Sequence, residues 1–139
     1  MSYLDNTSNP SKGLNIGLWA AQGFLALMFI MPAFMKIFQP IDALSGMLPW
    51  AGQVSPVVVR GLGVIDLLGG LGIILPSALR IQPKLTVWAA FGGIILMVCA
   101  IVFHLSRGES NVIGFNILLV ALLAFVAWGR STKAQIYAK

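Results

Sequence analysis

Four apolar runs constrain this chain more than any other feature of its sequence. They cover about residues 14–36, 56–75, 84–105 and 111–129. At about 1.5 Å per residue, a helix over each run would be roughly 30 Å long, which matches the hydrocarbon core of a bilayer. Backbone amides in lipid must find partners within their own segment, so each run is expected to be helical. The sequence therefore predicts an all-α, integral membrane four-helix bundle.

Composition supports a membrane protein and argues against a nucleic-acid partner. Hydrophobic residues make up 58% of the chain and charged residues only 9%, whereas a soluble domain carries roughly 25% charged residues. The net charge is +5, but the basic residues stand singly rather than in a run or a basic helix face. We therefore expect the lipid bilayer to be the main partner and expect no nucleic acid.

The segments between the runs predict how the helices follow one another. Residues 39–56 are rich in proline and glycine, and their "IDALSGML" portion could form a short helix at the membrane surface. The breaks at 76–84 and 106–111 are short, so the flanking helices should be antiparallel. We divide the chain into a polar N-terminal tail (1–13), a four-helix domain (14–130) and a basic C-terminal tail (131–139).

Basic residues predict the orientation of the bundle. Four spans place both termini on one side of the membrane, and that side carries six Lys and Arg residues against three on the other. By the positive-inside rule both termini should be cytoplasmic. The six are Lys12, Arg80, Lys84, Arg130, Lys133 and Lys139, and the three are Lys36, Arg60 and Arg107.

Polar residues inside the spans gather in the half of the bundle away from the termini. Asp66 lies near the midplane, about 15 Å from the start of its span, and Gln22 is expected at nearly the same depth. The other half should be almost wholly apolar. The candidate ligand- or proton-binding residues are Asp66, Lys36, His104, Arg60, Gln22, Glu109 and Asn116.

Asp66 is the residue that packing alone does not explain. A charge at the membrane midplane costs roughly 2.5–3.5 kcal/mol on insertion scales, so the aspartate needs partners or a proton. Gln22 could donate a hydrogen bond to it, and Lys36 and Arg60 could reach it from the nearer membrane face. Arg60 and Asp66 are six residues apart and do not share a helix face.

Glycines and the single cysteine have simpler interpretations. Glycines thin the second span so that neighbouring helices approach closely, although those beside Asp66 could also leave room for a flat ligand. These packing candidates are Gly61, Gly63, Gly69, Gly70 and Gly72. Cys99 cannot form an intrachain disulfide and is expected to be buried as a small apolar residue. No metal site is expected, because His104 has no ligand-type residue three or four positions away.

Short motifs in all four spans resemble the DoxX-like family of small bacterial membrane proteins. They are "PAFMKIF", "GLGVIDLLGGLGIILP", "LTVWAAFGGIILMVCAIVFHLSRGE" and "NILLVALLAFVAWGR". The resemblance places the family's lysine on Lys36, its acid on Asp66 and its histidine on His104, followed by Arg107, Gly108 and Glu109. It implies the bacterial plasma membrane and an association with membrane redox enzymes, with quinone as the candidate cofactor.

Three functions remain open at this point. The first is an accessory subunit of a membrane redox system, in which Lys36, Asp66 and His104 contact quinone. The second is a structural or assembly protein whose polar groups join the helices, and the third is a small proton-coupled carrier. The chain lacks paired cysteines and nucleotide-binding motifs, so it is not expected to be catalytic on its own. An oxidoreductase subunit or a second copy of the chain would be its protein partner.

Overall fold

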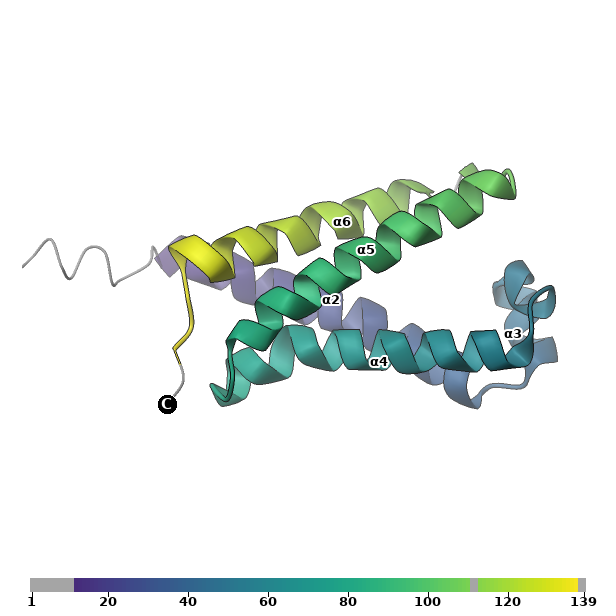
Figure 1. Ribbon diagram of the computed structural model, residues 1–139, viewed down its shortest axis with the longest axis horizontal. Coiled ribbons are helices and arrows are strands. Elements are labelled where there is room, and N and C mark those ends of the chain that lie inside the picture. Colours follow the sequence, from purple (N-terminus) through teal and green to yellow (C-terminus); the bar gives the residue numbers. More distant parts are fainter. Residues whose placement is uncertain (1–11, 111–112, 138–139) are drawn as a thin grey trace, which may run out of the picture.

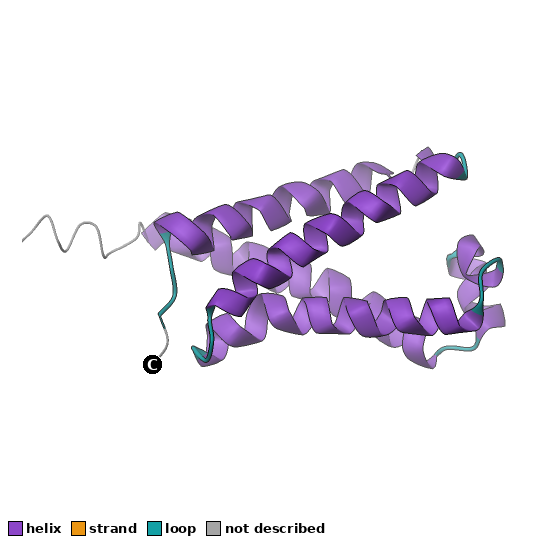
Figure 2. Ribbon diagram, viewed as in Figure 1, coloured by secondary structure: helices purple, strands orange, loops and turns teal. Residues whose placement is uncertain are grey.

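The fold is a bundle of four long antiparallel helices, as the sequence predicts. The computed structural model describes residues 12–110 and 113–137. The long helices are α2 (Lys12–Phe38), α4 (Pro56–Leu79), α5 (Lys84–Ser106) and α6 (Ile113–Trp128). Each is long and apolar enough to cross a membrane, with the last span counted as Ile113–Lys133. Figure 2 shows helices and connecting loops throughout the described part of the chain.

The helix ends differ from the predicted spans by a few residues. α2 begins at Lys12 and runs to Phe38, and α4 continues through Pro76 to Leu79. A proline inside a membrane helix is tolerated when its surroundings satisfy the freed carbonyl. α4 begins at Pro56 behind Ser55, whose hydroxyl accepts a hydrogen bond from the Val57 amide. The predicted start of the fourth span near residue 111 lies outside the described residues.

The helices form two pairs that separate along the bundle. α2 packs mainly on α4 and α5 on α6, while α4–α5 and α2–α6 contacts join the pairs. In Figure 1 the pairs lie close together where α4 turns into α5, and they spread apart toward α3. We call these the convergent end and the divergent end. The convergent end also holds a π-helical turn, η3 (Gly129–Lys133), which follows α6.

The divergent end is partly filled by the segment between α2 and α4. It contains α3 (Ile41–Met47), which is the short helix expected from "IDALSGML", and the 3-10 helix η1 (Pro49–Gly52). Trp50 and Leu44 from this segment pack with Val59 of α4 in a small apolar cluster. The main core lies between this cluster and the convergent end, where Leu25, Phe29, Ile73 and Leu123 are buried together.

Buried positions of α4 alternate in steps of four and three residues along the chain. They are Val59, Gly63, Asp66, Gly70, Ile73 and Ser77. This is the seven-residue spacing of a helix-packing seam. A Cβ on Gly63 would lie 2.8 Å from Ile37 Cγ1, and one on Gly70 would lie 2.6 Å from Ile30 Cγ1. The two glycines therefore let α2 approach α4 closely on both sides of Asp66.

The remaining glycines of α4 divide into one close contact and two open positions. A Cβ on Gly72 would lie 3.0 Å from Ala89 Cβ on α5. A Cβ on Gly69 would meet only Phe29 at 3.9 Å, and one on Gly61 would meet nothing within 4 Å in the part of the chain that the structure describes. The packing role predicted for Gly61 is wrong for these helices, because that position lies off the α4 seam.

Candidate functional site

The centre of the candidate site is an ion pair between α2 and α4. Lys36 Nζ lies 2.6 Å from Asp66 Oδ2 and also 5.6 Å from the centre of the Trp50 ring. The Asp66 side chain is 7% exposed and that of Lys36 is 15% exposed. Pairing an acid in an apolar bundle with a cation from the next helix removes much of the cost of burying either charge. Lys36 is therefore the partner of Asp66.

Arg60 lies on the same helix as Asp66 but serves the end of α2. Its Nη1 donates hydrogen bonds to the carbonyl oxygens of Lys36 at 2.8 Å and Gln39 at 2.6 Å. The last carbonyls of a helix lack partners within the helix and carry partial negative charge, so an arginine there is stabilising. Arg60 thus holds the backbone of Lys36 in place and does not contact Asp66 through any bond among the described residues.

A second cluster of polar side chains lies where α5 ends. His104 Nδ1 lies 2.9 Å from Glu109 Oε1, and Arg107 Nε donates to the same oxygen at 3.0 Å. The hydrogen bond from His104, followed by the one from Arg107, holds the pKa of Glu109 below its usual 4.5. The ionised carboxylate only accepts hydrogen bonds, so His104 Nδ1 must carry a proton. In the neutral ring, Nε2 is then left as a hydrogen-bond acceptor.

A cavity of about 460 Å³ brings four of the predicted residues together. We call it the interhelical pocket. Lys36, Asp66, His104 and Asn116 contribute polar groups from all four long helices. Its walls are otherwise largely apolar and include Leu62, Met97, Trp50 and Phe103. The volume falls in the range of small-molecule sites, roughly 300–1,000 Å³.

Asn116 differs from the other polar residues of the pocket because its amide nitrogen is unused. Its Nδ2 is buried and has no hydrogen-bond partner among the residues that the structure describes. A buried donor without a partner costs about 1–3 kcal/mol. Asn116 is therefore a ready donor for a group inside the pocket.

Cys99 also lines this pocket and is exposed, which corrects its predicted burial. The described residues contain no group of three His, Cys, Asp or Glu side chains close enough to hold a metal ion.

Gln22 lies elsewhere, in a polar cluster at the convergent end that the sequence analysis missed. Its Nε2 donates to the carbonyl oxygen of Ile73 at 2.8 Å, and its Oε1 accepts from Arg130 Nε at 2.7 Å. The expected hydrogen bond from Gln22 to Asp66 is therefore wrong. Arg130 Nη1 also donates to Asn15 Oδ1 at 2.8 Å and to the Ala134 carbonyl at 2.9 Å.

The prediction that this half of the bundle is almost wholly apolar is therefore wrong. Arg130 is only 5% exposed and Gln22 is fully buried. Ser77 of α4 and Thr86 of α5 add a buried hydroxyl pair at 2.7 Å. Two features of the sequence could have indicated this polar cluster: Gln22 in the middle of an apolar run, and Gly129 directly before Arg130. A Cβ on Gly129 would lie 2.5 Å from Leu18 Cδ2, so glycine is what lets η3 pack against α2.

Fold and site together define a small multi-pass membrane protein with a polar pocket between two helix pairs. The model of the DoxX-like family matches residues 20–126, which is most of the chain. The chain therefore belongs to the DoxX-like family. No curated protein and no solved structure is significantly similar to it.

Proposed function

We propose that this chain is an accessory subunit of a quinone-linked redox system in the membrane, and that the interhelical pocket receives the quinone head group. Such a head group is flat and apolar on its faces, with carbonyl oxygens at opposite edges. The pocket offers aromatic and aliphatic walls and a few polar groups from several helices. Small-molecule sites commonly have this composition.

The observation that carries the proposal is the unpartnered amide of Asn116. A carbonyl oxygen of the ligand would accept a hydrogen bond from this amide. Lys36, on α2, contributes a second polar group to the wall of the pocket. The Lys36–Asp66 pair and the His104–Glu109 pair then flank the ligand with groups that can hold or give a proton. Electrons would come from the partner oxidoreductase, since the chain has a single cysteine and no dithiol of its own.

A structural role is the second candidate, and the Lys36–Asp66 pair favours it. Lys36 and Asp66 are already hydrogen-bonded to each other. Beside them, Arg60 of α4 donates a hydrogen bond to the backbone at the end of α2. Interhelical hydrogen bonds often serve only to hold membrane helices together. On this interpretation the pocket binds nothing, and only the folded bundle matters to a partner protein.

Cys99 provides a native reporter that separates the two candidates. The purified chain would be alkylated with a maleimide, with and without a short-tailed benzoquinone whose ring positions are fully substituted. We expect the quinone to slow alkylation of Cys99 and to raise the melting temperature. Asn116→Leu should weaken this protection about five-fold, the value of one lost hydrogen bond of about 1 kcal/mol.

The matched control is Ile117→Ala, since Ile117 is the exposed neighbour of Asn116 and does not line the pocket. It should leave the protection unchanged. Asp66→Asn removes the charge but keeps the shape of the side chain. Unchanged alkylation and melting in the presence of quinone would exclude the quinone site, and normal support of the redox partner by Asp66→Asn would exclude a proton-transfer role.

A further inference from the structure

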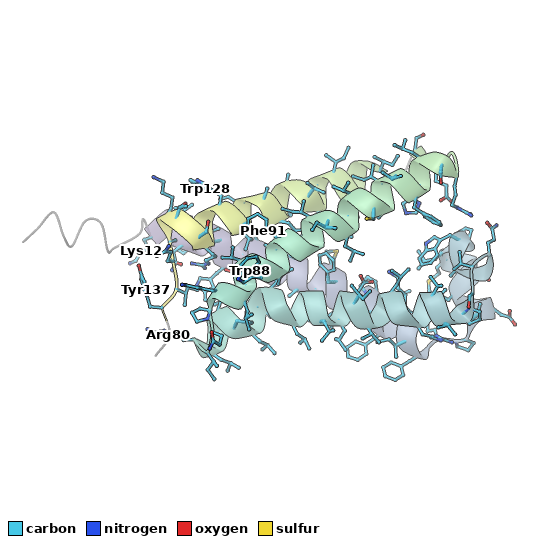
Figure 3. The ribbon with its side chains drawn as sticks, viewed as in Figure 1. Lys12, Arg80, Trp88, Phe91, Trp128 and Tyr137 are labelled. Carbon is cyan, nitrogen blue, oxygen red and sulfur yellow. The ribbon has the colours of Figure 1, made fainter. Side chains whose placement is uncertain are left out.

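A second cavity lies at the convergent end, away from the interhelical pocket. It measures about 690 Å³ and is formed by the α4–α5 turn, the first two turns of α5, η3 and the C-terminal residues 135–137. Arg80 Nε donates to the Tyr137 carbonyl at 2.8 Å, which holds these C-terminal residues against the turn. Figure 3 shows Arg80, Trp88, Phe91 and Tyr137 gathered at this end of the molecule.

Two cations and no acid are found among the described residues that line the cavity. Lys84 and Arg130 contribute to its wall, and the described lining contains no Asp or Glu. Of the acids in the described part of the chain, Asp42, Asp66 and Glu109 all lie toward the divergent end. An uncompensated pair of cations at a membrane end attracts anions.

Arg130 lines this cavity and has one guanidinium nitrogen without a hydrogen-bond partner among the described residues. Its Nε and Nη1 are taken by Gln22, Asn15 and Ala134, but its Nη2 is buried without a hydrogen-bond partner in the described residues. The residue as a whole is 95% buried, being 5% exposed. A guanidinium with one unused nitrogen suits an oxyanion, because its donors match phosphate oxygens in geometry.

Lys84 gives an independent indication of an anion. It is the first residue of α5, and the first turn of that helix contains no acid. The start of a helix carries partial positive charge, which favours an anion and disfavours a lysine. The side chain of Lys84 and the partial positive charge of the helix start therefore lie side by side at this end of α5, in addition to Arg130.

The apolar side of the cavity extends along the lipid-facing surface of α5. Trp88 is 70% exposed and Phe91 is 49% exposed, and Val87 lies between them and the helix start in the lining. Tyr137 and Trp88 are residues typical of the membrane–water boundary. A ligand that fits both sides has an anionic head at Lys84 and Arg130 and hydrocarbon along α5.

We infer that this cavity binds the phosphate group of an anionic phospholipid, with its acyl chains on the exposed face of α5. This site is separate from the interhelical pocket, and the two proposals do not depend on each other. A soluble phosphate would share the head-group chemistry but would not use Trp88 and Phe91. The bound lipid would brace the C-terminal residues against the α4–α5 turn.

The test uses the full chain in detergent with phosphatidylglycerol, phosphatidylcholine or inorganic phosphate, and native mass spectrometry to measure what stays bound. We expect phosphatidylglycerol to be retained in preference to phosphatidylcholine. Lys84→Gln should lower its affinity about five-fold, the effect of removing one basic residue near an anionic head group. Lys133→Gln is the matched control, because Lys133 is an exposed cation of the same end outside the lining.

Each outcome decides the proposal. Equal retention of the two phospholipids would overturn it, and so would an equal loss in Lys84→Gln and Lys133→Gln, which would indicate diffuse surface charge. Inorganic phosphate that displaces phosphatidylglycerol at similar concentration would reassign the site to a soluble anion. Arg130→Lys can be added as a further variant once a melting curve shows that it folds. If Arg130→Lys unfolds, Lys84→Gln alone still tests the proposal.

Discussion

Lys36, which is partly buried, and Arg130, which is buried, have opposite kinds of partner. Lys36 at the divergent end is paired with the carboxylate of Asp66. Within the described residues, Arg130 at the convergent end donates hydrogen bonds to the neutral oxygens of Gln22, Asn15 and Ala134. The first cluster is electrically neutral and borders a pocket suited to a neutral ligand. The second keeps a full positive charge and borders a cavity suited to an anion. Under the two proposals above, pairing determines which kind of ligand each end accepts.

Breaking the neutral cluster should have the largest effect. Lys36→Met leaves Asp66 as an unpaired acid within the bundle, and loss of one partner of a buried pair costs about 3–5 kcal/mol. The double variant Lys36→Met with Asp66→Leu should recover most of this loss, since both charges are gone. Unfolding in mixed micelles measures the free energies, and a double variant no more stable than Lys36→Met would show that the pair is not the cause.

Removing the cation of the other cluster should cost somewhat less. Arg130→Met leaves the side-chain oxygens of Gln22 and Asn15 without their donor, and we expect a loss of about 2–3 kcal/mol for these buried groups. Arg130→Lys should recover only part of this, because an ammonium cannot match the fork of a guanidinium. The same unfolding measurement applies, and full recovery by Lys would show that charge alone matters.

A substitution in the glycine seam beside the Lys36–Asp66 pair should give the next largest loss of stability. Gly70→Ala places a methyl group 2.6 Å from Ile30 Cγ1 and 3.2 Å from the Ala26 carbonyl oxygen, and overpacking of this kind costs about 1–3 kcal/mol. Gly61→Ala is the control, because its methyl group meets open space and alanine favours the helix by about 1 kcal/mol. A comparable loss of stability in both variants would refute close packing at Gly70.

The smallest effect should come from the loop that holds His104. Because the pKa of Glu109 is lowered in the folded chain, its contribution to stability is present above its usual pKa of 4.5 and is lost as the pH falls through the lower folded value. Glu109→Gln should therefore melt below the wild type at neutral pH, and the two curves should meet in acid. A constant difference at all pH values would contradict this origin.

Counting along the spans predicted the half of the bundle in which four polar residues meet, but neither the depth of Gln22 nor the direction in which side chains point. Lys36, Asp66, His104 and Asn116 were all placed in the half of the bundle where they meet. Gln22 was matched to the wrong partner because its depth was misjudged: it donates to the carbonyl oxygen of Ile73, seven residues beyond Asp66 on α4. The spacing of Gly63, Asp66 and Gly70 gives the missing direction for α4, since it marks one face.

The position of Arg130 at the end of an apolar run predicts a place outside the bundle, and the structure differs. A basic residue that ends an apolar run usually lies in water beside the head groups. Here η3 turns the side chain inward, and the chain then returns so that Ala134 can accept its hydrogen bond. The contacts of Arg130 with Gln22 and Asn15 join residues more than a hundred positions apart, so neighbouring residues in the sequence do not identify these partners.

The ion pair between α2 and α4 also determines which alignment of the two helices is allowed. Gly63 and Gly70 are seven residues apart, so a slide of about 10 Å along the seam would bring one glycine to the place of the other. The apolar contacts of the seam alone would tolerate such a shift in register. The ion pair would not, because the slide would carry Asp66 away from Lys36 and leave both charges in the apolar bundle. The ion pair, together with the hydrogen bonds from Gln22 to Ile73 and from Arg60 to Lys36, thus selects one register from several that packing would permit.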